Sequence, residues 1–261
     1  MTAILVALAV GLCVGVIVGA LGAGGGILSV PILVYLLGQD PHDAAAGSLV
    51  IVGLTALVSI IPHARAGRVR ARDGLVFGAL SVVGAVAGSR LSILVDADVL
   101  MTLFGVLLLG VSVLMVRRAG KERRGLARAP KTRSDTSLVA LVGCATLTGF
   151  LTGFFGVGGG FAVVPMLVLA LAVPMREAVG TSLLVMIIAS ATGLASRVGT
   201  HVSVDWAVVL AFAAASMAGG LVGGPASRRF NDSTLTYAFG AVLALVGVAT
   251  LGQTAYALIA G

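Results

Sequence analysis

The chain has 261 residues, of which 59% are hydrophobic and only 10% are charged, and its formal net charge is +7. A soluble core of this size cannot bury so much apolar side chain, so the composition predicts an all-α membrane protein and excludes a disordered chain, a disulfide scaffold and a soluble enzyme. The cations lie in short loops between apolar runs, where they orient helices, so we expect no nucleic acid as a partner.

The apolar runs, taken in chain order, form two sets of five. The first set lies at about 3–20, 27–38, 43–62, 74–95 and 98–116, and the second at about 136–154, 161–173, 177–196, 205–226 and 234–258. A helical crossing of the bilayer needs about 20 apolar residues, so little of the chain is left for an extramembrane domain. We therefore expect a first transmembrane repeat at 1–116, a basic cytoplasmic linker at 117–135 and a second transmembrane repeat at 136–261, all in the plasma (inner) membrane.

The two halves share sequence. GALGAGGGILSVP (Gly19 to Pro31) aligns without a gap on GFFGVGGGFAVVP (Gly153 to Pro165), with seven of thirteen residues identical. Five segments in each half is an odd number, so the halves are expected to be inverted repeats. With the N-terminus outside, this arrangement places 15 of the 17 Lys and Arg on the cytoplasmic side, whereas an eight-crossing alternative places 13 there.

The short runs after the two glycine triplets predict broken helices. Each run has about 12 residues, or roughly 18 Å of helix, which does not cross a hydrocarbon core of about 30 Å. Consecutive glycines disfavour a continuous helix by about 1 kcal/mol each, so we expect each helix to stop at its triplet and to restart with Pro31 or Pro165 in its first turn. The two restarted helices would meet near the midplane, where their free N–H groups favour a small anion.

The candidate site follows from these breaks. The predicted substrate-binding residues are the glycines of the two triplets and hydroxyl residues early in the third helix of each half: Gly24, Gly25, Gly26, Ser48, Gly158, Gly159, Gly160, Thr181 and Ser182. Alternatively, these hydroxyls donate a hydrogen bond to the backbone carbonyl one helical turn earlier and bind no substrate. Arg90 and Arg197 are candidates for attracting an anion, with snorkelling to the interface as the alternative.

Other residues are expected to be structural. Glycines four apart predict close helix packing: Gly11/Gly15/Gly19, Gly84/Gly88, Gly219/Gly223 and Gly220/Gly224. The three histidines show no metal-ligand spacing and are expected to be solvated, at the inner end of a helix for His63 and in outer loops for His42 and His201. Because no cysteine motif is present either, neither a metal nor another cofactor is predicted.

The glycine motifs resemble those of a known family. The paired G-x-G-G-G-x(4)-P stretches, with the A-x(3)-S-L pattern of Ala44, Ser48 and Leu49 and its counterpart at Ala178, Ser182 and Leu183, are similar to those of the TauE/SafE sulfite-exporter family of membrane transporters. The resemblance covers both halves. It implies a permease for a small, often sulfur-containing anion such as sulfite or a sulfonate, and an architecture usually described as eight crossings.

Together these features predict a secondary transporter for a small anion that works by alternating access of two halves around one site. An anion channel is the alternative. An intramembrane enzyme is a third possibility with less support, because the spans contain no convincing nucleophile and base and no metal cluster. The coupling ion, a proton or sodium, the direction of transport and the oligomeric state stay open.

Overall fold

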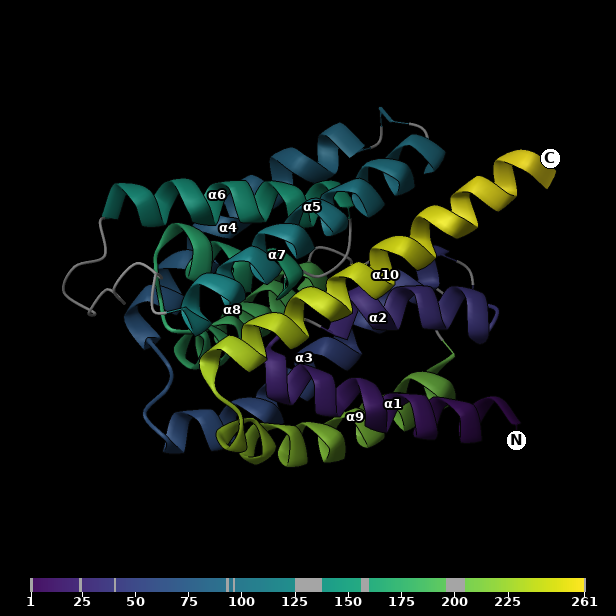
Figure 1. Cartoon of the computed structure of the whole chain (residues 1–261). Coiled ribbons are helices and arrows are strands. Elements are labelled where there is room, and N and C mark those ends of the chain that lie inside the picture. The colour runs from purple at the N-terminus through teal and green to yellow at the C-terminus, as the bar shows by residue number, and fades with distance from the viewer. Residues whose placement is uncertain are drawn as a thin grey trace.

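The computed structural model describes residues 2–23, 25–39, 41–92, 94–95, 97–124, 138–155, 160–195 and 205–260 (Figure 1). Within these ranges all regular secondary structure is helical. The helices are α1 (Thr2–Leu21), α2 (Gly25–Pro31), α3 (Pro41–Arg65), α4 (Ala71–Ser92), α5 (Ala97–Arg123), α6 (Leu138–Phe155), α7 (Gly160–Pro165), α8 (Met175–Ala195), α9 (Trp206–Ala226) and α10 (Asp232–Ala260). Two π-helical segments, η1 (Ile32–Leu36) and η2 (Met166–Ala170), follow the two shortest helices, and a 3-10 turn, η3 (Ser227–Arg229), follows α9.

Seven of the described helices are long and apolar enough to cross a membrane: α1, α3, α4, α5, α8, α9 and α10. Large apolar side chains cover the outside of the bundle, and Val139 on α6 is 82% exposed and Leu245 on α10 is 71% exposed. Hydroxyl residues such as Ser182 are instead buried inside. An apolar outer surface around a partly polar interior suits lipid rather than water, and the chain is a multi-pass membrane protein.

The predicted linker at 117–135 begins inside a helix. α5 continues through Arg117 and Arg118 to Arg123, and the remainder of the linker from residue 125 onward lies outside the described residues. In this last part of α5 the guanidinium of Arg118 pairs with the carboxylate of Glu122 one turn later, at 3.0 Å. The helix therefore extends beyond its apolar run, because charged residues spaced four apart support it there.

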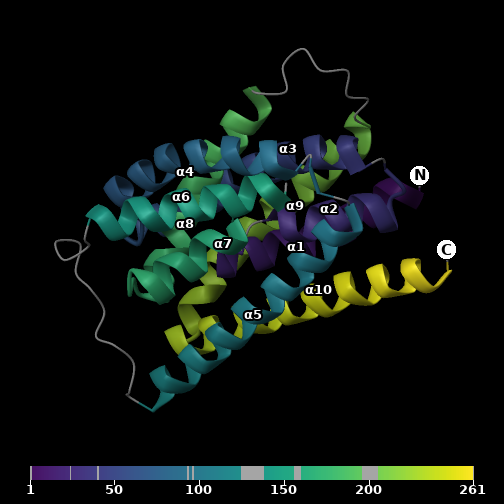
Figure 2. The ribbon, with the colours of Figure 1, turned by 90° about the horizontal axis from the view of Figure 1, so that it is seen from above.

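The closest helix pairs join the two halves of the sequence. The most extensive contacts are between α1 and α9 and between α4 and α6, followed by those between α5 and α10, which form one flank of the molecule in Figure 2. In each pair one helix belongs to the first half and the other to the second. The two sequence repeats are therefore not separate packed units, because helices of the first half pack most extensively against helices of the second.

Glycines make the two closest pairs possible, as the four-residue spacings predict. On α1, a Cβ at Gly15 would overlap the backbone carbonyl of Ser216 on α9, and a Cβ at Gly19 would overlap that of Gly220. On α6, a Cβ at Gly149 would overlap the carbonyl of Ser81 on α4. These pairs, α1–α9 and α4–α6, are called the glycine seams below; their backbones approach so closely that only glycine fits.

The order of contacts shows that the helices of a seam are parallel. Gly15 lies on Ser216 and Gly19, one turn later, lies on Gly220, so position along α1 and α9 increases together. The contacts between α4 and α6, between α3 and α9, and between α4 and α8 run in the same sense. Helices α1, α3 and α9 therefore form one parallel group and helices α4, α6 and α8 form another.

The two groups oppose each other. Along the α3–α8 contact Leu49 lies on Gly193 and Gly53 lies on Ser190, so position along one helix increases as it falls along the other. Each helix of these groups consequently points against its counterpart in the other half, which is the arrangement that inverted repeats require. Because α1 and α3 point the same way, the chain between them, which contains α2 and η1, has to travel back. The start of α1 and the end of α10 lie at the same end of the bundle (Figure 1).

Candidate functional site

The first glycine-rich break separates α1 from α2. α1 ends at Leu21, and Gly22 has a φ of +62°, a left-handed conformation that glycine adopts without strain. The Ser182 hydroxyl on α8 donates to the carbonyls of Gly22, at 3.2 Å, and Val179, at 2.8 Å. A predicted site residue of the second half thus contacts the break in the first half.

Beyond this break, α2 packs on α3. Gly25 and Gly26 are buried, while Gly24 lies outside the described residues. A Cβ on Gly25 would lie 3.2 Å from a methyl group of Val52 and 3.6 Å from the Ser29 hydroxyl. Ser29, which the sequence analysis did not single out, is fully buried, and its hydroxyl has no hydrogen-bond partner in the described part of the chain. A buried hydroxyl in this state suits a bound water or ligand.

The second break repeats part of this arrangement. Gly160 is buried at the start of α7, and Gly158 and Gly159 lie outside the described residues. α2 and α7 contact each other. The two short helices that begin within the glycine triplets, although far apart in sequence, therefore lie together inside the bundle.

The prolines do not begin the short helices, so the expectation for Pro31 and Pro165 was wrong. Each is the last residue of its helix, α2 or α7, and directly precedes a π-helical segment. Proline has no N–H for the carbonyl four residues earlier, so the normal ladder cannot continue through it. In both halves, hydrogen bonds to the carbonyl five residues earlier follow the proline. The amide of Leu37 donates to the carbonyl of Ile32 at 3.0 Å, and the amide of Leu171 donates to that of Met166 at 3.1 Å. Such π-helical turns occur often at functional sites.

The other predicted hydroxyls, Ser48 and Thr181, are buried as well. The Thr181 hydroxyl accepts a hydrogen bond of 3.1 Å from the backbone amide of Arg70, at the end of the α3–α4 connection. Thr181 therefore holds this connection of the first half against α8 of the second, a role that the sequence did not indicate.

Arg70 forms an ion pair across the two halves. Its side chain is only 3% exposed, and its Nε donates to the Glu177 carboxylate on α8 at 2.6 Å. Asp73, at 3.7 Å from the guanidinium, is a second acidic neighbour. A buried guanidinium needs such partners, since the cost of removing it from water is large. This ion pair lies at the end of the α3–α8 contact where α3 ends and α8 begins.

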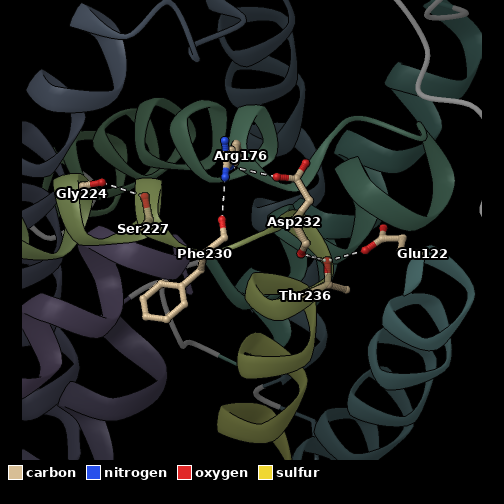
Figure 3. A network of polar contacts seen from close by, with 7 residues as sticks. All are labelled: Glu122, Arg176, Gly224, Ser227, Phe230, Asp232 and Thr236. Atoms are coloured by element: carbon tan, nitrogen blue, oxygen red, sulfur yellow. Dashed lines mark hydrogen bonds and ion pairs between the residues drawn. The ribbon is translucent and has the colours of Figure 1, made fainter. Parts of the chain in front are cut away.

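The residue before Glu177 anchors the same end of α8 to the second half. Arg176 pairs with Asp232 at 3.0 Å and donates to the carbonyl of Phe230 at 2.6 Å, as Figure 3 shows. The Thr236 hydroxyl, one turn into α10, lies 3.2 Å from the Glu122 carboxylate of α5. The first turn of α8 is therefore tied both to its own half and, through Glu177, to the other.

Of the two candidate arginines, the structure describes Arg90 and does not bring it to this cluster. Arg90 lies in the last turn of α4 with an exposed side chain, as expected of an interfacial or snorkelling cation. Arg197 lies outside the described residues.

His63 contradicts the expectation of a solvated histidine. Its side chain is 2% exposed, and its Nε2 lies 2.8 Å from the carbonyl oxygen of Gly19, near the end of α1. The sequence offered one signal that was not used: Ser48, Thr55, Ser59 and His63 lie at helical spacing on one face of α3. All four are buried.

The comparisons with known proteins agree on the type of protein. Residues 7–250 match the family described as Sulfite exporter TauE/SafE. A probable membrane transporter protein of Xylella fastidiosa (strain 9a5c) is 34% identical over 249 residues, which are 92% of each chain. The probable membrane transporter protein YunE of Bacillus subtilis (strain 168) is 30% identical over 247 residues, 87% of this chain and 89% of its own. No solved structure matches the chain.

The family match extends over both glycine-rich breaks, both π-helical segments and the α3–α8 contact. Both relatives are named probable membrane transporter proteins, and the similarity covers 92% and 89% of their length. The chain belongs to the TauE/SafE family and is a membrane transporter.

Proposed function

We propose that the chain moves a small anion, sulfite or an organosulfonate, across the plasma membrane by alternating access. The family's description as a sulfite exporter supports the choice of substrate. The observation that carries the proposal is the contact between α2 and α7, the two short helices that follow the glycine-rich breaks. Non-helical backbone inside a membrane protein is stable only where protein surrounds it or water reaches it, and transporters of several folds place their sites at such breaks.

The proposed site lies between the 24–28 and 158–162 segments. Backbone N–H groups at the start of α2 and α7 and the Ser48 hydroxyl would bind the anion, with Ser29 as an addition from the structure. The Ser182 hydroxyl would join them by giving up its hydrogen bonds to the Gly22 and Val179 carbonyls. Hydroxyl and amide donors recognise an oxyanion without a formal charge nearby. Such a site binds a sulfur oxyanion and releases it again, since no strong ion pair has to be broken.

Alternating access also needs contacts that open and close. The Arg70–Glu177 pair and the Arg70–Thr181 hydrogen bond hold the α3–α4 connection, which links the two parallel helix groups, against the first turns of α8. In the proposed cycle these bonds break when this end of the bundle opens, while the glycine seams stay closed. The moving units are then the groups α1–α3–α9 and α4–α6–α8 rather than the two sequence halves.

The test is an exchange assay with purified protein in liposomes. Radiolabelled sulfite inside the vesicles is exchanged against external sulfite, thiosulfate, sulfoacetate, acetate or a neutral sugar. Saturable exchange that the sulfur anions compete for, and that the sugar does not, supports the proposal. Flux that does not saturate indicates a channel, and competition by the neutral sugar alone contradicts anion recognition.

A further inference from the structure

His63 combines burial with the ability to change charge near neutral pH. Among the described side chains, those of His63 and Arg70 are the buried ones that can carry a charge, at 2% and 3% exposed. An arginine stays protonated in proteins, whereas an imidazole gains and loses a proton between about pH 5 and 8. His63 is also the one histidine of the three whose side chain the structure describes.

The imidazole caps the end of α1. The Gly19 carbonyl can only accept, so the ring nitrogen Nε2, at 2.8 Å, carries the hydrogen of this bond. Gly19 is among the last four residues of α1, whose carbonyls lack partners within the helix. The C-terminal end of a helix carries partial negative charge and favours a cation next to it. The environment of His63 therefore accommodates the neutral ring and offers local stabilisation to the charged one.

Both halves surround the ring. A Cβ on Gly224 of α9 would lie 3.5 Å from His63 Nε2, and a Cβ on Gly180 of α8 would lie 3.3 Å from the His63 Cβ. α1 and α9 contain no charged residue. The charged groups at this end of the remaining neighbours are Arg65 of α3, Arg68 and Arg70 of the α3–α4 connection, Arg72 and Asp73 of α4, and Arg176 and Glu177 of α8; Arg90 lies in the last turn of α4. An added positive charge at His63 would repel the cations of the α3–α4 connection, which holds the Arg70–Glu177 pair.

Two buried hydroxyl residues lie next to His63 on the same face of α3. Ser59 and Thr55 lie one and two turns before it on the same face, and they are 0% and 1% exposed. Neither hydroxyl has a hydrogen-bond partner among the residues that the structure describes. The Ser59 hydroxyl packs on Gly220 of α9, with the Thr55 methyl group 3.7 Å from the position of a Cβ there. A buried hydroxyl needs a hydrogen-bond partner, which water can supply, and hydroxyls with water conduct protons because each donates and accepts.

We propose that His63 binds the proton that drives this transporter, so that movement of the anion is coupled to movement of a proton through the α3 face formed by Thr55, Ser59 and His63. The inference rests on the proposed transport function and names its coupling ion. The neutral ring keeps its Nε2 hydrogen on the Gly19 carbonyl and takes a proton from water at Nδ1 to become an imidazolium. Loss of that proton to water on the other side restores the neutral ring.

The first experiment measures protonation without any substrate. The full-length double variant His42→Gln, His201→Gln has His63 as its single histidine, and its imidazole nitrogens are labelled with 15N and followed by NMR in lipid nanodiscs between about pH 5 and 9. We expect a reversible titration inside this range. Ring signals that stay constant over the whole range would overturn the proposal, whatever the protein transports.

The second experiment measures coupling in liposomes with sulfite. A gradient of one pH unit is equivalent to about a tenfold concentration ratio for each coupled proton, so the wild type should accumulate sulfite up to about tenfold further with the gradient than without it. In His63→Gln, whose amide still donates to Gly19, we expect exchange at equal pH to persist and the effect of the gradient to disappear. The matched control His42→Gln, on the same helix, should behave as the wild type.

The outcomes separate the two proposals. Sulfite itself gains and loses protons with pH, but it does so equally in the assays of all variants. A difference between two variants therefore comes from the protein. If His63→Gln accumulates sulfite as the wild type does, the coupling role is wrong although transport stands. If the wild type exchanges none of the tested anions, the transport proposal fails, and the coupling falls with it even if His63 titrates.

Discussion

The glycine seams and the α3–α8 contact hold the molecule together by different means. In the seams α1–α9 and α4–α6, glycine backbone faces a carbonyl with no room for a side chain. Around α8, glycine contacts such as that of Gly193 with Leu49 of α3 are joined by polar ones: the Ser182 hydroxyl bonds to the first break, and Thr181 and Glu177 bond to Arg70. Close packing has one good arrangement, whereas hydrogen bonds and ion pairs can be exchanged for others. In the proposed cycle the seams keep the helices assembled, while the polar contacts around α8 change.

The largest effect is expected in a seam. In Gly149→Ala the new methyl group would overlap the carbonyl of Ser81, a rigid backbone atom, so α4 and α6 must separate. We expect a loss of about 3 kcal/mol in the free energy of unfolding. The matched control is Gly143→Ala, the same change on the same helix, where the methyl group meets nothing within 4 Å. Thermal unfolding in detergent measures both, and equal melting temperatures would contradict the account of the seams.

The next effect concerns the ion pair across the halves. Glu177→Gln removes the charge that faces the buried Arg70 guanidinium. Since Glu177 is 31% exposed and water screens part of the interaction, we expect a loss of about 2 kcal/mol rather than the full cost of an unpaired buried charge. Asp73→Asn, which alters the longer contact of 3.7 Å, should cost less than half as much. A larger effect for Asp73→Asn in denaturant titrations would show that the guanidinium depends mainly on Asp73.

A glycine at the break should affect transport more than folding. In Gly25→Ala the methyl group would lie 3.2 Å from a side-chain methyl of Val52, which can move, so unfolding should change by no more than about 1 kcal/mol. The same methyl group would crowd the proposed anion site and lower sulfite exchange about tenfold, which corresponds to about 1.4 kcal/mol in the barrier. Gly110→Ala, in open space on α5, is the control. Full exchange by Gly25→Ala would remove Gly25 from the site.

The smallest effect tests single hydroxyls on α8. Ser182→Ala loses the hydrogen bond to the Gly22 carbonyl and should cost about 1 kcal/mol. Ser190→Ala is the matched control, because the Ser190 hydroxyl is buried without a partner among the described residues and its removal should be neutral or stabilising. Chemical unfolding of both variants provides the measurement, and a larger loss for Ser190→Ala would mean that its hydroxyl binds something that the structure does not contain.

Local signals in the sequence predicted local features well. The apolar runs predicted the long helices, and the glycine triplet predicted the end of α1 at Leu21 and a separate α2 from Gly25. Glycine acts through its own backbone, so its consequence can be read at its own position. The place of Pro31 was missed, because α2 begins six residues before it and the missing N–H affects the end of the helix instead of its first turn.

Features that depend on distant partners were not predictable in the same way. His63 is buried because it meets the end of α1, 44 residues earlier, and Arg70 because it meets Glu177, 107 residues later. A count of cytoplasmic cations treats Arg70 as one loop charge among many and says nothing about its partner. The pairing of α1 with α9 was hidden as well, because helices that are apolar on all sides do not show which face will be packed.

The exchange of helices between the halves has a consequence for biogenesis. α1 is synthesised first, but its partner α9 begins only at Trp206. The glycine face of α1 therefore stays without its partner in the membrane until most of the chain has been inserted. α4 waits less long, since α6 begins at Leu138. The second seam can therefore form during translation while the first closes late, and a chain that stops after the first repeat would leave both faces open to lipid or to other proteins.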